Sequence, residues 1–300
     1  MHSSNTIRTN DGTKIWTSCY TPDVPNNKVI IIAPGIGLTH DYYHLFADFF
    51  CKQGFSVITF DFRGIGNSGP ATLRGYKANM HQWAAQDINA VILYAKQQYS
   101  NQELIYIGHC IGGEIVGLAP ASQYINKLVL ISSALSCARL WPWQSKIRIE
   151  GMKILVRMST RLFGYFPGKK LNILGNLPQG VIYEWANWCD NSNGLFDDFP
   201  DNNYRKFNVP ILAITFSDDW HCPPRAVKEL LSRFDHSSVT WYHMKPAEAG
   251  MKKIGHSDFF RLRMENSLWP VLLQWLGKDE GKPKQPKSIT IKRFLNEKEK

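Results

Sequence analysis

The sequence predicts an α/β fold, a mostly parallel twisted sheet with helices on both faces and a helical insertion. Short apolar runs such as Val29-Ile30-Ile31-Ile32-Ala33 lack polar alternation, which indicates strands that are buried on both faces. These runs alternate along the chain with helical patterns, as in successive strand–helix–strand units. The alternation stops near residue 137 and resumes near residue 208.

The elements follow in a regular order. A hairpin comes first, with strands at 6–9 and 13–17 around the turn signal Asn10-Asp11-Gly12. Further strands are expected at 28–33, 55–60, 104–107, 128–132, 209–216 and 239–243. Helices are expected at 42–53, 83–98, 111–118, 224–234 and 259–276. Residues 1–136 and 208–277 are therefore predicted to form the core of the fold.

The interrupting segment, residues 137–207, is rich in aromatic side chains, and prolines interrupt it. The rings are Trp141, Trp143, Phe163, Tyr165, Phe166, Tyr183, Trp185, Trp188, Phe196 and Phe199. Roughly seventy residues is too long for a plain loop, so we expect a helical lid. Its rings either line a pocket for an apolar ligand or join the lid to the core.

Composition and charge narrow the class of protein. The hydrophobic fraction of 44% is normal for a globular chain, and the net charge is +10. Residues 278–300 hold eight Lys or Arg against four Asp or Glu, so we expect a basic C-terminal tail. No nucleic-acid motif accompanies the charge, which favours a basic solvated surface over nucleic-acid binding.

The apolar runs and the cysteines indicate where in the cell the protein is expected. No run is long enough to span a bilayer and no secretory signal is visible, so we expect a cytoplasmic protein without stable membrane insertion. Six cysteines without CxxC spacing favour free thiols over a disulfide framework. We expect a monomer or a homodimer.

The strongest motif is Gly108-His109-Cys110-Ile111-Gly112, which lies between a predicted strand and a predicted helix. A Gly-x-nucleophile-x-Gly turn in this context is a nucleophile elbow, here with cysteine where serine is usual. Gly108 and Gly112 remove side chains where the strand and the helix pass closely. The alternative is an inert buried cysteine on a glycine-rich turn.

The acid and the base of a triad are expected later in the chain, in that order. Asp219 follows the strand at 209–216 and precedes a proline-initiated helix, so we assign it as the acid, with Asp218 as the alternative. His256 lies in a loop before the last helix and is assigned as the general base. A metal at His221 and Cys222 is not expected, since other ligands at suitable spacing are missing.

An oxyanion hole needs two backbone N–H groups. One is expected from Ile111, directly after Cys110. The other is expected from Ile36, in the loop Pro34-Gly35-Ile36-Gly37, unless that loop is an ordinary glycine turn. Catalysis by such a site requires no cofactor and no metal.

With these residues in place, the chain resembles the α/β-hydrolase superfamily over nearly its whole length, the tail excepted. Asp61-Phe62-Arg63-Gly64-Ile65-Gly66-Asn67-Ser68 resembles a segment of the serine-aminopeptidase-like, monoglyceride-lipase-like branch. Several further segments are similar to an uncharacterised bacterial group of predicted α/β-hydrolases that commonly has serine in the elbow. They are Phe166-Pro167-Gly168-Lys169-Lys170, Leu177-Pro178, Glu184-Trp185-Ala186-x-Trp188-Cys189 and Gly255-His256. The resemblance implies fold, triad and lid, and no defined substrate.

The cysteine leaves three interpretations. Cys110 is the nucleophile of a hydrolase, His256 takes its proton and Asp219 holds the imidazole. Alternatively, the same triad transfers acyl groups, or the protein is a catalytically silent binding module. The first predicts hydrolysis of a small-molecule ester or thioester with an apolar acyl or alkyl group.

Overall fold

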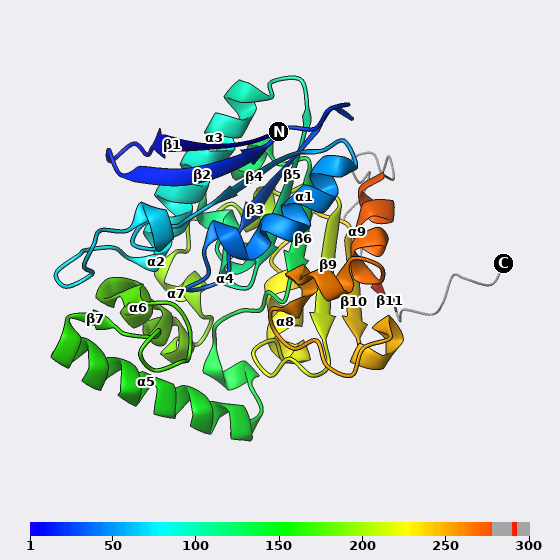
Figure 1. The fold of residues 1–300 in the computed structure, drawn as a ribbon. Helices are drawn as coiled ribbons and strands as arrows, with labels where there is room; N and C mark the ends of the chain where they lie inside the picture. The colour runs from blue at the N-terminus through cyan, green and yellow to red at the C-terminus, as the bar shows by residue number, and fades with distance from the viewer. Residues whose placement is uncertain (278–289, 293–300) are drawn as a thin grey trace.

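The computed structural model describes residues 1–277 and 290–292, and a twisted sheet of nine strands lies at its centre (Figure 1). The strand order is β1-β2-β4-β3-β5-β6-β9-β10-β11. The strands are β1 (His2–Arg8), β2 (Lys14–Tyr20), β3 (Lys28–Ala33), β4 (Ser56–Phe60), β5 (Glu103–His109), β6 (Lys127–Ile131), β9 (Ile211–Phe216), β10 (Val239–Met244) and β11 (Thr290–Lys292). β1–β2 and β2–β4 pair antiparallel and all other neighbours pair parallel, which confirms the mostly parallel sheet.

Helices cover both faces of the sheet, as the apolar strands predict. Successive residues of β3 enter two different clusters: Ile31 packs with α3 (Asn89–Gln98) and α8 (Pro224–Leu231), whereas Ile30 and Ile32 pack with α1 (His44–Lys52) and α9 (Leu268–Gly277). Side chains alternate between the faces of a strand, so a strand covered on both sides must be apolar throughout. Because β3, β4, β5, β6, β9 and β10 run parallel, their carboxyl ends lie at the same end of the sheet.

Three helix predictions need correction. The closing helix starts at Leu268, not at residue 259, and short 3₁₀ turns (Asp258–Phe260 and Leu262–Met264) precede it. The helix after the elbow, α4 (Ile111–Glu114), ends early and continues as a 3₁₀ turn. The helix expected at 83–98 consists of a π-helical segment, Trp83–Ile88, followed by α3. A short α2 (Met80–Gln82) precedes it.

Between β6 and β9 the chain leaves the sheet and forms mostly helices (Figure 1). This insertion comprises α5 (Trp143–Phe163), the two-residue strands β7 (Tyr165–Phe166) and β8 (Leu177–Pro178), α6 (Gln179–Asp190) and α7 (Leu195–Asp198). Its aromatic side chains divide between two roles. Trp188 and Phe166 are fully buried in the core, whereas Trp141 and Trp185 line a cavity.

The remaining predictions concern the tail, the thiols and the membrane. Most of the basic tail expected at 278–300 lies outside the described residues; within it, residues 290–292 form β11 beside β10. All six cysteines lie in the described part of the chain and are free, as expected. Among the described residues, none of the helices combines the length and the apolar character that crossing a bilayer requires.

Candidate active site

Cys110 lies at the tight turn between β5 and α4. Its backbone has φ +53° and ψ −119°, a conformation that is strained for a residue with a side chain. The flanking glycines are required by packing. A Cβ on Gly108 would lie 2.3 Å from the Gly113 Cα, and one on Gly112 would lie 2.6 Å from the Ala33 carbonyl oxygen. The turn therefore places a partly exposed thiol at the end of a buried strand.

Two neighbouring aspartates after β9 make different contacts. The side chain of Asp219 is fully buried, and its Oδ2 lies 2.8 Å from Nδ1 of His256. Asp218 Oδ2 accepts hydrogen bonds from the backbone N–H groups of Ile254, at 2.9 Å, and Gly255, at 3.0 Å. Asp219 thus contacts the imidazole, while Asp218 holds the loop that carries it.

The charges in this group support one another. Burial raises the pKa of Asp219, but hydrogen bonds from His221 and His256 outweigh it and hold the pKa well below its ordinary value. Burial lowers the pKa of His256, but the adjacent Cys110 and the hydrogen bond to Asp219 outweigh it and hold the pKa well above its ordinary value. Cys110 and His256 also line the same cavity. Sulfur, imidazole and carboxylate therefore form a continuous series of contacts.

A second thiol, that of Cys222, lies beside Cys110, His256 and Asp219. Cys222 Sγ lies 4.0 Å from Nδ1 of His256, but it is buried, and burial raises the pKa of the Cys222 thiol well above its ordinary value. The structure thus brings two thiols to one histidine, and only Cys110 combines exposure with the elbow. The closeness of Cys222 could not be inferred from the sequence.

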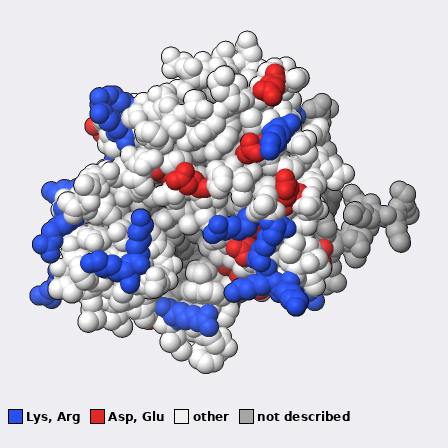
Figure 2. Space-filling view, viewed as in Figure 1, with Lys and Arg blue, Asp and Glu red and all other residues white. Residues whose placement is uncertain are grey.

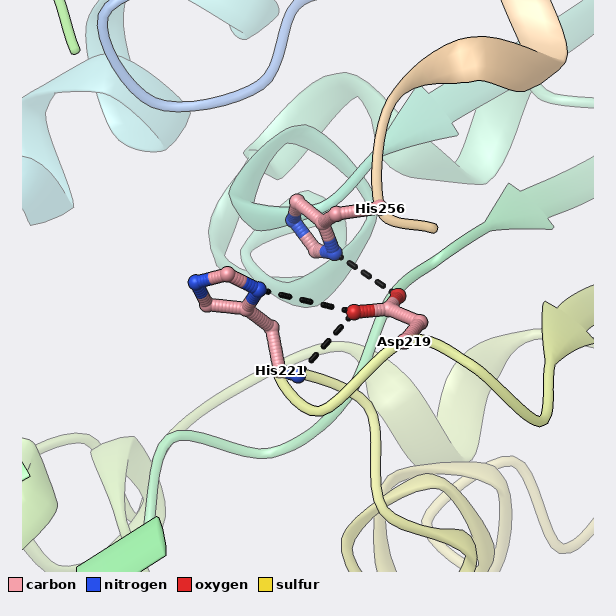
Figure 3. A group of neighbouring side chains, drawn as sticks. All are labelled: Asp219, His221 and His256. Carbon is pink, nitrogen blue, oxygen red and sulfur yellow. Dashed lines mark hydrogen bonds and ion pairs between the residues drawn. The ribbon is translucent and has the colours of Figure 1, made fainter. Parts of the chain in front are cut away.

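Figure 3 shows the carboxylate of Asp219 beside both imidazole rings, with one oxygen toward His256 and the other toward His221. Asp219 Oδ1 accepts from the backbone N–H of His221 at 3.0 Å and lies 3.5 Å from Nδ1 of the same residue. One potential ligand atom from each of the three residues lies within 4.8 Å of the others, so they could hold a metal ion. Such an ion would compete with the hydrogen bond between His256 and Asp219. Sequence reasoning missed this grouping, because His256 comes from a distant loop.

A buried chain of hydrogen bonds joins the elbow to the loop after β3. The Gly35 N–H donates to the Tyr43 hydroxyl at 2.8 Å, and this hydroxyl lies 2.8 Å from Nδ1 of His109. His109 Nε2 lies 3.1 Å from the carbonyl oxygen of His256. Burial lowers the pKa of His109 to about 3, so the ring is neutral, with Nδ1 accepting and Nε2–H donating. His109 and Tyr43 thus fix the relative positions of three loops, a role that the sequence did not reveal.

Of the two expected oxyanion donors, Ile111 directly follows Cys110 in the chain, whereas Ile36 comes from the distant loop after β3. Ile111 is the first residue of α4, so its N–H has no acceptor within the helix. Ile36 and Cys110 both line the same cavity.

The cavity has a volume of about 470 Å³. Its wall is largely apolar and includes Trp141, Ile149, Met152, Ile182 and Trp185 from the insertion, together with Cys110 and His256. A largely apolar wall beside a reactive group is typical of a site for a small apolar molecule.

Glu114 is an unexpected member of the cavity wall. It is buried, and its carboxylate oxygens accept hydrogen bonds from the backbone N–H of Ser136 at 2.5 Å and from the Ser136 hydroxyl at 2.8 Å. Burial raises the pKa of Glu114 to about 8, so the carboxyl group is mostly protonated at neutral pH. The sequence could have indicated this location, because Glu114 follows Cys110 by four residues and so lies one helical turn after it.

Comparison with known proteins agrees with this fold. The family model described as the alpha/beta hydrolase fold matches residues 28–249. No curated protein sequence matches the chain.

Several solved structures share the fold. One, described as DcsB in complex with its substrate analogue, has a TM-score of 0.65 and 16% identity, covering 92% of this chain and 99% of that one. The esterase EaEST from Exiguobacterium antarcticum has a TM-score of 0.61 and 18% identity, covering 91% and 99%. The α/β hydrolase GrgF from Penicillium sp. sh18 has a TM-score of 0.60 and 17% identity, covering 92% and 96%. The family match spans well over half of the chain, and the protein therefore belongs to the α/β-hydrolase fold family.

Proposed function

We propose that the protein is a hydrolase that cleaves a carboxylic ester or thioester with an apolar acyl or alkyl group, with Cys110 as its nucleophile. One observation carries the proposal. The partly exposed thiol at the strained elbow contacts His256, which contacts the buried Asp219, and all this lies in the wall of an apolar cavity.

The proposed reaction has two steps. His256 accepts the Cys110 proton, the sulfur attacks the acyl carbon, and the N–H groups of Ile36 and Ile111 stabilise the oxyanion. His256 then donates the proton to the leaving alcohol or thiol as the acyl–oxygen or acyl–sulfur bond breaks. In the second step His256 takes a proton from water, and the resulting hydroxide attacks the acyl carbon. The carbon–sulfur bond breaks, the acid leaves, and the proton on His256 returns to the Cys110 sulfur. Asp219 stabilises the imidazolium in both steps.

We further propose that residues 137–207 act as a lid. The support is the contribution of Trp141, Ile149, Met152, Ile182 and Trp185 to the cavity wall. These side chains would exclude water from the acyl group, while Cys110 and His256 act at the edge of the same cavity.

Turnover of p-nitrophenyl esters and acyl thioesters of two to twelve carbons tests the proposal. The variants are Cys110→Ala, Cys110→Ser and His256→Ala, with Cys222→Ala as the matched control because it removes the other nearby thiol. Both Cys110→Ala and His256→Ala should lose activity, and Cys222→Ala should keep most of it. Full activity in Cys110→Ala would refute the assignment. Preferential transfer to an added alcohol or thiol instead of water would identify an acyltransferase.

A further inference from the structure

The helix α5 carries large apolar side chains on its solvent-exposed side as well as on the side that packs on the protein. Its buried residues are Ser145, Ile149, Lys153, Val156, Ser159 and Thr160, of which four are polar. Its exposed large side chains are Trp143, Ile147, Ile154, Met158 and Leu162, each between 58% and 68% exposed. We call these five residues the outer face of α5. The solvent-exposed side of a surface helix is normally polar.

The inner side of α5 combines apolar packing by Ile149 and Val156 with polar contacts to α6. The Thr160 hydroxyl lies 2.7 Å from the Tyr183 hydroxyl of α6, and Lys153 forms an ion pair with Asp190 at the end of α6. Two of the buried polar side chains of α5 thus have partners in α6. The outer face remains without a partner among the described residues.

The outer face forms one continuous stripe. At 100° per residue its five side chains fall within an arc of about 100°, and from Trp143 to Leu162 the stripe is about 28 Å long. With Leu171 and Ile173, residues 143–173 hold seven of the fourteen large hydrophobic side chains that are exposed in the described residues. Such a concentration indicates a binding surface.

Positive charge accompanies the stripe. Residues 143–176 contain one acidic residue, Glu150, which pairs with Lys153 at 2.8 Å. Six further Lys or Arg side chains lie in the same segment: Lys146, Arg148, Arg157, Arg161, Lys169 and Lys170. Figure 2 shows Lys and Arg, and no visible Asp or Glu, over the lower left of the molecule, where α5 lies in Figure 1.

We infer that the outer face of α5 docks on the surface of an anionic lipid bilayer. The five apolar side chains would enter the boundary between headgroups and acyl chains, and the flanking cations would face the anionic headgroups. A long straight stripe matches a plane, and its positive flanks would repel a second copy of the chain. Because α5 also contributes Ile149 and Met152 to the cavity wall, docking would bring the cavity next to the bilayer.

Vesicle co-sedimentation of the full chain tests this inference without measuring activity, so it is independent of the proposed reaction. The vesicles contain phosphatidylcholine alone or with 30% phosphatidylglycerol. The chain should bind the anionic vesicles at least tenfold more tightly than the neutral ones. Binding should weaken at least fivefold between 0.1 and 0.5 M NaCl, because salt screens the cations.

The decisive variant is the triple substitution Ile147→Ser, Ile154→Ser and Met158→Ser, which should weaken binding to anionic vesicles at least tenfold. Its matched control is Leu93→Ser with Leu262→Ser, since both side chains are exposed elsewhere on the protein. Circular dichroism melting verifies that each variant is folded. Absence of binding to anionic vesicles, or equal binding by the triple variant, would overturn the inference. A dimer that the triple variant dissociates, without vesicle binding, would instead assign the outer face to self-association.

Discussion

Replacing Asp219 by Asn should reduce turnover far more than replacing its neighbour Asp218. The buried Asp219 carboxylate accepts the 2.8 Å hydrogen bond from His256, and the Asn side chain cannot stabilise the imidazolium by charge. A hydrogen bond to a charged group contributes about 1.5–3 kcal/mol, which corresponds to about a 10- to 150-fold loss of kcat/KM. Burial means that solvent does not screen this contribution.

Asp218→Asn is the matched control. The Asn side chain keeps an oxygen that can accept from the N–H groups of Ile254 and Gly255, and it is exposed, so we expect less than about a threefold change. The assay is p-nitrophenyl ester hydrolysis from pH 5 to 8. The pKa of Asp219 lies well below its ordinary value, so Asp219 stays ionised over this range and does not itself titrate.

The pH dependence adds a second readout. Removing the Asp219 charge removes one of the causes that raise the pKa of His256, so the profile of Asp219→Asn should shift to lower pH. Equal losses in the two Asn variants would refute the assignment of the two carboxylates. An unshifted profile in Asp219→Asn would refute the electrostatic role.

Three further predictions concern stability, measured by urea unfolding. Tyr43→Phe should lower the free energy of unfolding by about 1–3 kcal/mol, because two buried hydrogen-bond partners lose the hydroxyl. Tyr42→Phe should lower it less, because Tyr42 is only partly buried. Equal losses in the two variants would contradict the buried network. Gly112→Ala should lower the free energy of unfolding by about 1–3 kcal/mol or more, because the added methyl group would overpack the turn. Gly151 has open space around it, so Gly151→Ala should raise the free energy of unfolding by about 0.5–1 kcal/mol. An unchanged stability of Gly112→Ala would contradict the packing argument. The pKa of Glu114 is raised from 4.5 to about 8, so the folded state binds this proton more tightly and loses stability as the pH rises from 4.5 through 8. Glu114→Gln removes this loss, so its free energy of unfolding should rise relative to the wild type by an amount on the order of 4 kcal/mol between pH 5 and 9; a constant difference would contradict the buried proton.

The sequence predicted the strands well, because a parallel sheet covered on both faces requires uninterrupted apolar runs. The main error in the helices has a local cause. Pro270 would lie deep inside a helix running from 259 to 276, whereas in the structure it lies in the first turn of α9, where a proline is tolerated. The short α4 has a similar explanation, because Gly112, Gly113 and Gly117 weaken its continuation.

The order of residues along the chain was enough to select Cys110, Asp219 and His256 as candidates, since the fold requires nucleophile, acid and base in that order. The sequence could not show which of two adjacent aspartates reaches the imidazole. It also could not show that Cys222 lies beside His256, because this contact depends on how two loops pack. The outer face of α5 was likewise hidden, since only the structure shows which side of the helix is buried.

The central claim is that Cys110 becomes acylated during turnover, and mass spectrometry of the acid-quenched protein tests it most directly. After mixing with a p-nitrophenyl ester, the peptide that contains Cys110 should gain the mass of the acyl group. Neutral hydroxylamine should remove this mass, as it does from a thioester, and Cys110→Ala should never acquire it. Turnover without an acyl group on Cys110, or an acyl group on Cys222 instead, would contradict the account.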